Sequence, residues 1–280
     1  MASVVSISAA IDDAFCSAER VTLVGSMTPA FTMSSYCSVA ALKPKFGLAL
    51  LRTFSMTMAP STPALPLTGI VCLNRGEFDR LAADHVGGSP GVQGYYDPRS
   101  NRLTLYDMGG NGDSANWHRN AAVLIHEATH QMAFNTGIHS RYVPPPAWLA
   151  EGLATLFEAP GVCDSHNHTQ MADRVNRDRL RAFQRFVAPR HRPEVLASVV
   201  ASDDLFHVNP QAAYAEAWAL TFCLIETEPR KYSQYLKRTA SRPPFRKYTA
   251  AERTADFTAV FGGDWRMLEA RFLRFMAGVK

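Results

Sequence analysis

The segment Val123–Met132 places His-Glu-x-x-His within an apolar run, and this pattern restricts the fold more than any other part of the chain. Residues i and i+4 lie on one face of an α-helix, so His126 and His130 can direct two imidazoles at one metal ion. Burying these polar side chains among Val, Leu, Ile and Ala costs free energy that a bound metal would offset. Glu127 lies beside the pair, where a general base for a metal-bound water is needed.

The residues around the motif favour a metal site over a chance match. The intervening positions carry no charge, and Met132 is apolar, as is typical of zinc-binding helices. With nine histidines in 280 residues, a chain of this composition has roughly 0.01 such motifs by chance. We therefore expect a metal-binding helix over about residues 115–134, which Asn135 and Gly137 would end.

A catalytic zinc takes three protein ligands and keeps one position open for water. The leading third ligand is Glu151, on a second expected helix over 147–158. Gly152 beside it would permit the close approach of another helix. The alternative for Glu151 is an ordinary exposed helical glutamate. A rival donor pair, His166 and His168, lies in a polar stretch that favours an exposed loop.

The elements expected before the motif helix include strands. In the first 66 residues we expect a short helix near 11–18, a strand over 20–25 and a proline-marked loop at 60–66. A strand over 69–73 and a helix over 74–83 follow. The runs 92–96 and 102–107, separated by the turn-like Asp-Pro-Arg-Ser-Asn, predict a β-hairpin.

After the second motif helix the chain is largely helical, with helices expected at 169–187, 193–202, 210–227, 229–240 and 264–277. The order of elements predicts an α+β protein. Its N-terminal part, 1–137, would hold a small mixed β-sheet and the motif helix. Its mainly helical part, 138–280, would carry the third ligand.

Two segments, 126–130 (His-Glu-Ala-Thr-His) and 148–155 (Trp-Leu-Ala-Glu-Gly-Leu-Ala-Thr), give the chain a family resemblance. It resembles the gluzincin branch of the zincin metallopeptidases, in which a Trp-Leu-x-Glu-Gly-x-Ala segment supplies the third zinc ligand. The gap between the segments is two residues longer than in the aminopeptidases of that branch. With its Gly-Tyr-Tyr hairpin, the chain also resembles an uncharacterised bacterial family, domain of unknown function 1570. The resemblance is strong over about 92–158 and weaker beyond.

The resemblance implies a zincin-like fold with one Zn²⁺ ion, held by His126, His130 and Glu151. Glu127 would act as general base and then as proton donor to the leaving amine. Glu158, seven residues after Glu151, matches a carboxylate that orients a ligand histidine by accepting its other ring N–H. An exposed glutamate near a helix end is the alternative for Glu158.

A hydrolase of this kind also stabilises an oxyanion. In similar families a tyrosine on a later helix does so, and Tyr214 matches it in order and in its small neighbours. A core tyrosine is the alternative reading, and Tyr142 and His139 are rivals for the same role.

The resemblance implies a zinc-dependent hydrolase that cleaves peptide bonds in a peptide or protein substrate. An endopeptidase is favoured, because the run 91–96 lacks the acidic residue with which the aminopeptidases hold a substrate N-terminus. The alternative is a non-catalytic zinc-binding domain that binds a protein or glycan. The retained Glu127 speaks against that alternative.

Charge and cysteine content restrict other classes. The net charge of +4 is small, and the basic stretches 174–192 and 230–247 lack the interleaved aromatic residues of nucleic-acid modules, so no nucleic-acid partner is expected. No transmembrane helix is evident, and the first residues make a poor secretory signal, which leaves the compartment open. Five scattered cysteines argue against a disulfide scaffold and favour core thiols, with one isolated bridge still possible.

Overall fold

A computed structural model of the chain describes residues 38–42, 67–72, 74–86, 91–108, 114–163, 170–190 and 193–280. The elements predicted near 11–18, 20–25 and 60–66 lie outside these residues, as do His166 and His168. Tertiary contacts divide the chain into two units between Met132 and Ala133, within helix α4 (Ser114–Asn135). The boundary predicted from the sequence lies slightly later, between residues 137 and 138.

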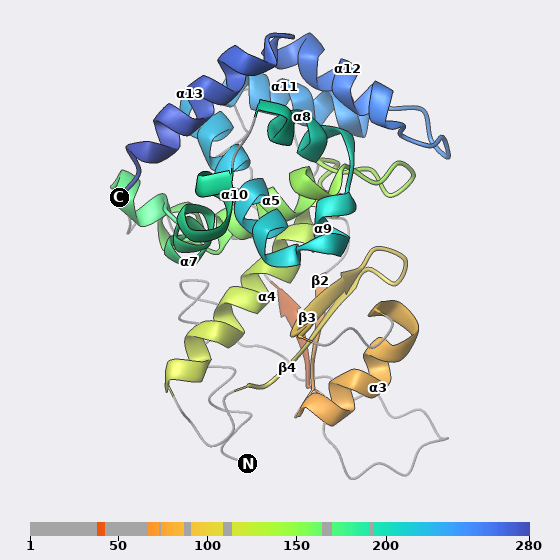
Figure 1. Ribbon diagram of the computed structural model, residues 1–280. Coiled ribbons are helices and arrows are strands. Elements are labelled where there is room, and N and C mark those ends of the chain that lie inside the picture. Colours follow the sequence, from red (N-terminus) through yellow and green to blue (C-terminus); the bar gives the residue numbers. More distant parts are fainter. Residues whose placement is uncertain are drawn as a thin grey trace. The chain divides into compact units, whose positions relative to one another are not determined.

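The first unit contains a four-stranded mixed sheet with the order β1-β2-β4-β3 (Figure 1). Strand β2 pairs antiparallel with β1 and parallel with β4, and β3 and β4 form an antiparallel hairpin. The predicted hairpin and the mixed sheet are thus confirmed. Helix α3 follows β2 where a helix over 74–83 was predicted. The bounds of these elements are Ser38–Leu42 (β1), Leu67–Cys72 (β2), Arg75–Val86 (α3), Gly94–Asp97 (β3) and Arg102–Tyr106 (β4).

Helices α3 and α4 cover opposite faces of this sheet. The ring of Phe78 on α3 packs against Tyr95 and Tyr106, with centroid distances of 5.8 and 5.3 Å. A Cβ atom on Gly94, the neighbour of Tyr95, would lie 2.6 Å from Cγ1 of Val123 on α4. Successive residues of a strand point to opposite faces, so the sheet is enclosed by a helix on each side. The middle of β4 is accordingly buried on both faces.

The second unit is helical, which confirms the α+β class (Figure 1). The helices predicted at 147–158, 193–202, 210–227, 229–240 and 264–277 are present within a residue or two. The observed helices are Ala147–Phe157 (α5), Pro160–Cys163 (α6), Arg177–Ala182 (α7), Pro193–Ala201 (α8), Asp204–Val208 (α9), Pro210–Thr227 (α10), Pro229–Ala240 (α11), Ala250–Phe261 (α12) and Trp265–Ala277 (α13).

The prediction of one continuous helix over 169–187 is wrong. A 3₁₀ turn at Met171–Arg174 ends where Val175 and Asn176 adopt extended backbone angles. The Asn176 side chain then accepts a hydrogen bond from the Arg179 amide and begins α7. A π-helical turn at Phe183–Val187 and a 3₁₀ turn at 188–190 follow α7. The local hydrogen bond of the asparagine therefore competes with continuous helix formation.

Helix α10 is the centre of the second unit and is buried on nearly all sides. It contacts α5, α7, α9, α11 and α13. Around it, Trp148 of α5 stacks on Tyr235 of α11 at 5.7 Å and meets the ring of Phe257 of α12 at 6.0 Å. A helix that is apolar all round belongs in a core, so the other helices are arranged about α10.

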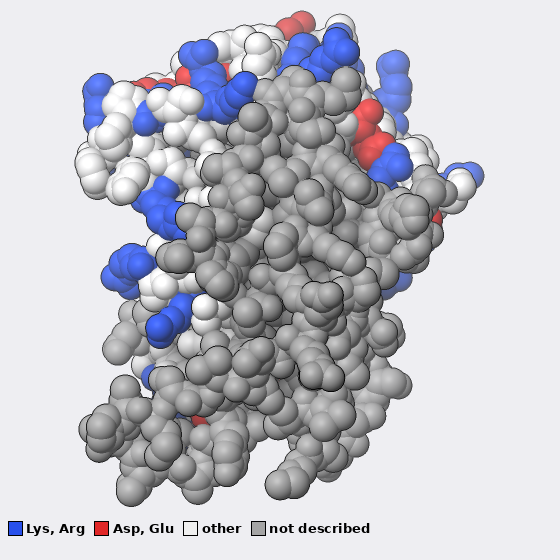
Figure 2. Space-filling view, turned by 180° about the vertical axis from the view of Figure 1, so that it is seen from behind, with Lys and Arg blue, Asp and Glu red and all other residues white. Residues whose placement is uncertain are grey.

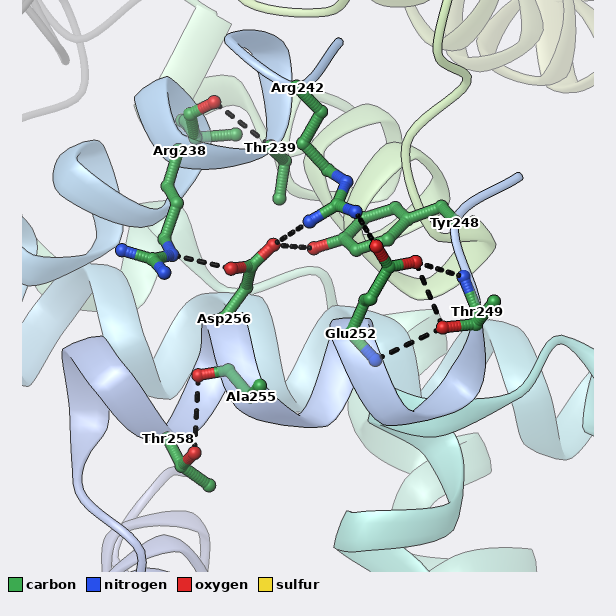
Figure 3. A network of polar contacts seen from close by, with 10 residues as sticks. Arg238, Thr239, Arg242, Tyr248, Thr249, Glu252, Ala255, Asp256 and Thr258 are labelled. Atoms are coloured by element: carbon green, nitrogen blue, oxygen red, sulfur yellow. Dashed lines mark hydrogen bonds and ion pairs between the residues drawn. The ribbon is translucent and has the colours of Figure 1, made fainter. Parts of the chain in front are cut away.

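Helix α12 was not predicted, and a buried carboxylate holds it to α11. Asp256 accepts hydrogen bonds from Arg238 (2.6 Å), Arg242 (2.7 Å) and the Tyr248 hydroxyl (2.8 Å), as Figure 3 shows. Burial and the hydrogen bond to Asp256 raise the pKa of Tyr248, so its hydroxyl remains a donor. Two guanidinium groups compensate the charge of Asp256, so the removal of either partner would leave part of a buried charge unpaired. Among the described residues, no helix has the length and apolar character needed to cross a membrane.

Candidate metal centre

Helix α4 brings the two motif histidines to one point, as the i, i+4 spacing predicts. The Nε2 atoms of His126 and His130 are 3.2 Å apart, and the ring planes are inclined at 78°. Two nitrogens bound tetrahedrally to one zinc at about 2.0–2.1 Å would lie about 3.4 Å apart. The observed separation is close to this value, and it also suits a hydrogen bond between the two ring nitrogens.

Glu151 on α5 joins this pair. One potential ligand atom from each of His126, His130 and Glu151 lies within 4.8 Å of the others. This is the one group of three such side chains found in the part of the chain that the structure describes. All three are buried or partly buried. Two imidazoles and one carboxylate are a donor set suited to a divalent transition metal with a position left for water.

Two side chains of α4 fix this helix to the sheet on either side of the motif. Gln131, which is fully buried, donates from Nε2 to the carbonyl oxygens of Thr68 (3.1 Å) and Asn101 (2.7 Å). Asn120 accepts from the Met108 amide and donates to Asp107 at 2.8 Å. These bonds set the rotation of α4 and therefore the direction of the histidines. The local pattern around Gln131 contains no signal for these two remote acceptors.

The general-base candidate Glu127 is buried, with 7% of its surface exposed. A Cβ atom on Gly94 of β3 would lie 3.3 Å from the Glu127 Cγ atom and 3.2 Å from the Thr104 carbonyl oxygen. Glycine at this position therefore lets the strand run directly against the glutamate. Among the strands that the structure describes, β3 is also the last in the sheet order.

Helix α5 is positioned by close packing against α10. A Cβ atom on Gly152 would lie 2.1 Å from Oγ1 of Thr221 and 2.5 Å from the carbonyl oxygen of Ala217. The expectation that Gly152 permits close helix approach is confirmed. Glu151 directly precedes Gly152 in the chain. The close contact at Gly152 therefore also fixes the position of the Glu151 backbone relative to α10.

The first turn of α5 is held by Asp203, a residue that the sequence did not single out. Its Oδ1 atom accepts from the Ala147 amide at 2.9 Å. Arg253 of α12 donates to both carboxylate oxygens of Asp203, at 2.8 and 2.9 Å. A carboxylate at a helix N-terminus satisfies a free amide and opposes the helix dipole. The partner comes from a distant segment, so the local pattern around Ala147 contained no signal for it.

Glu158 and Tyr214, the two other predicted site residues, are connected through α7. The Glu158 carboxylate accepts from Asn176 Nδ2 at 2.7 Å and lies 3.8 Å from an Arg179 nitrogen. The Arg179 guanidinium lies 5.1 Å from the centre of the Tyr214 ring, whose edge contact with Phe206 is 5.4 Å. Glu158 and Tyr214 thus both have defined contacts. These contacts do not test the predicted roles, which are orientation of a ligand histidine for Glu158 and oxyanion stabilisation for Tyr214.

The two rivals of Tyr214 have contrasting environments. Tyr142 is 63% exposed and packs its ring against Phe245 at 5.3 Å. His139 is buried, with its Nδ1 atom 3.1 Å from the Ile138 carbonyl oxygen and its ring against Phe134.

The basic stretches form ion pairs with acidic side chains of the same unit. Arg174 makes two hydrogen bonds of 2.8 Å to Glu226, and Arg238 and Arg242 bind Asp256. On the face that Figure 2 shows, Lys and Arg side chains are dispersed among other described residues, with acidic side chains nearby. The two cysteines whose environment is described, Cys72 and Cys223, are buried free thiols, as expected for core residues.

Comparison with protein families gives one match. Residues 120–246 match the family described as Protein of unknown function (DUF1570). The matched segment contains both motif histidines, Glu127, Glu151, Glu158 and Tyr214, and it ends within the loop before α12. The hairpin of β3 and β4 lies outside it. Comparison with curated proteins and with solved structures found no match.

Proposed function

We propose that this chain is a zinc-dependent hydrolase of the gluzincin type, with a zincin-like fold, that cleaves peptide bonds. The observation that carries the proposal is the group His126, His130 and Glu151, whose ligand atoms lie within 4.8 Å of one another. The buried Glu127 lies on the same helix turn as the first histidine. A metal-binding group with an adjacent carboxylate that is not needed as a ligand is the arrangement that metal-assisted hydrolysis requires.

The donor set favours zinc over the other common divalent ions. Calcium and magnesium prefer oxygen ligands, of which this group has only one side chain. Zinc accepts imidazole and carboxylate together, and three protein ligands leave a position for water. When bound, zinc would supply a water of pKa near about 7 and would polarise the scissile carbonyl.

The chain's own residues would move the proton. Glu127 would accept a proton from the attacking water and deliver it to the leaving nitrogen. Tyr214, whose ring contacts Phe206 and Arg179, would donate its hydroxyl to the developing oxyanion. Glu158 would accept the second ring N–H of a ligand histidine and so fix its orientation.

The position of β3 as the last described strand of the sheet favours a peptide as the substrate. An extended peptide that adds to the edge of a sheet gains backbone hydrogen bonds with little sequence preference. At Gly94 the backbone of β3 lies against Glu127 without an intervening side chain. The run 91–96 has no acidic side chain to hold a substrate N-terminus, which favours an endopeptidase over an aminopeptidase.

The test combines metal analysis with turnover of a broad peptide library. Wild type should bind one zinc per chain, and His130→Ala should lose it. Glu127→Gln should retain the zinc and lose activity by about a thousandfold or more. Glu194→Gln, an exposed glutamate of α8, is the matched control and should behave as wild type.

Two results would contradict the proposal in different ways. Zinc below one per chain in wild type, or unchanged zinc in His130→Ala, would refute the site. Full zinc binding with no difference in turnover between wild type and Glu127→Gln would instead identify a zinc-binding domain that recognises a protein or glycan without cleaving it.

A further inference from the structure

The helical unit contains a cavity of about 390 Å³ where α8, α10, α12 and α13 meet. Its walls are mostly apolar, formed by leucine and phenylalanine side chains that include Leu220, Leu224, Phe257 and Phe272. The volume is within the range of small-molecule sites in proteins, which is about 300–1,000 Å³. The cavity is therefore large enough for a ligand with an aliphatic body.

The polar groups of this cavity are few. The Thr227 hydroxyl is already committed to the Cys223 carbonyl oxygen at 2.6 Å, and Glu228 forms an ion pair with Lys231. Arg271 of α13 also lines the cavity and is exposed. It has no ion-pair partner among the residues that the structure describes. Arg271 is thus the cationic group available to a ligand there.

The Cys223 side chain in the cavity wall carries no charge. Burial raises the pKa of the Cys223 thiol to about 12, so this wall residue stays neutral at physiological pH. A neutral thiol behaves as a small apolar group. Apart from the Glu228 carboxylate, which pairs with Lys231, and the bonded Thr227 hydroxyl, the cavity consequently has apolar walls and one cationic side chain, Arg271.

We infer that this cavity binds a monocarboxylic acid with a medium-length aliphatic chain, the carboxylate being held by Arg271. An aliphatic chain gains free energy for each methylene group that leaves water for the apolar walls. A guanidinium binds a carboxylate through two parallel hydrogen bonds, which gives the head group its orientation. This site is separate in its residues from the metal ligands and does not depend on hydrolysis.

Isothermal titration of the full chain with decanoate tests the inference. We expect saturable binding of one decanoate per chain in wild type. Arg271→Gln should weaken the affinity by about tenfold, the usual worth of a charge-assisted hydrogen bond. Arg274→Gln is the matched control, because Arg274 is exposed on the same helix but does not line the cavity. Its affinity should equal that of wild type.

Two further arms separate head-group from chain recognition. Decyltrimethylammonium, which has the same chain and the opposite charge, should bind more weakly than decanoate in wild type. Cys223→Met, which fills part of the cavity with a flexible apolar side chain, should weaken both ligands while circular dichroism shows a folded protein. Absence of saturable decanoate binding, or equal affinity in wild type and Arg271→Gln, would overturn the inference. So would equal affinity for the cationic ligand.

Discussion

Helices α4 and α5 supply the ligands of the candidate metal centre, and they are held in place in different ways. Helix α4 is fixed to the sheet and its connecting segments by the directional hydrogen bonds of Gln131 and Asn120. Helix α5 is fixed by close packing at Gly152, where α10 leaves no room for a single added carbon. The position of α4 should therefore be sensitive to the loss of a group. The position of α5 should be sensitive to the addition of one.

The largest effect should follow Gly152→Ala. The new Cβ atom would lie 2.1 Å from Thr221 Oγ1 and 2.5 Å from the Ala217 carbonyl oxygen. The latter is backbone inside a buried helix and cannot rotate away, so α5 must move. We expect a loss of on the order of 3 kcal/mol in the free energy of unfolding, with weaker zinc binding because Glu151 moves with the helix. Urea unfolding and zinc titration measure both.

A second glycine of the same unit provides the control for this substitution. A Cβ atom on Gly263 would have no neighbour within 4 Å, so Gly263→Ala should leave stability nearly unchanged. Equal stabilities of the two alanine variants would show that α5 and α10 are not in steric contact in solution.

Removal of a group should act on α4, and Gln131→Met is the test. Methionine has a similar length but cannot donate to the carbonyl oxygens of Thr68 and Asn101. Leaving two acceptors without this donor should cost about 2 kcal/mol. The control is Thr129→Val, which removes only a hydroxyl bonded within the helix to the Ile125 carbonyl oxygen. If both variants lose equally little stability, hydrogen bonds to the sheet do not fix α4.

This difference also explains what could be predicted from the sequence. Three predictions rested on local patterns: the His-Glu-x-x-His spacing, the hairpin around residues 97–101 and Gly152 beside Glu151. The structure has the paired histidines, the hairpin and the close helix contact that these patterns predict. The position of α4 on the sheet depends on Gln131, whose two acceptors are remote in sequence. A polar residue in an apolar run gives no information on where its partner lies, so its role could not be predicted.

The errors in the helical part have a similar cause. The helix predicted over 169–187 is interrupted at Asn176, whose side-chain oxygen caps α7 locally while its amide nitrogen bonds to Thr155 and Glu158, which are remote in sequence. By contrast, α12 was missed although its start carries a local signal. Thr249 and Glu252 form a capping box, in which each side chain bonds to the other's backbone amide. A search for this pattern would have found the helix.

Acid pH should weaken the support of α4 through Asp97, the last residue of β3, whose carboxylate binds the turn that ends at Asn101. Burial alone would raise the pKa of Asp97. Hydrogen bonds from the Ser100 side chain and from the backbone amides of Arg99 and Ser100 outweigh burial and lower this pKa to about 2. A lowered folded-state pKa contributes stability above the unfolded value of 3.8, and this is lost as pH falls through about 2.

The stability that depends on Asp97 ionisation should be about 2 kcal/mol at neutral pH. The measurement compares wild type with Asp97→Asn in urea unfolding between about pH 5 and 2, so that other acidic groups cancel. Their difference should shrink towards acid. A difference that stays constant with pH would show that the Asp97 charge does not stabilise the turn.

The smallest effect should come from Asp203→Asn, at the start of α5. The asparagine keeps an oxygen for the Ala147 amide and loses the charge that pairs with Arg253, so the helix remains capped. The partly buried pair should be worth about 1 kcal/mol in unfolding free energy, whereas Asp178→Asn, in an exposed pair with Arg181, should change it by less than about 0.5 kcal/mol. Zinc affinity should be nearly unchanged in both, because packing at Gly152 rather than charge positions Glu151. A large loss of zinc affinity in Asp203→Asn alone would show that α5, like α4, depends on directional polar contacts.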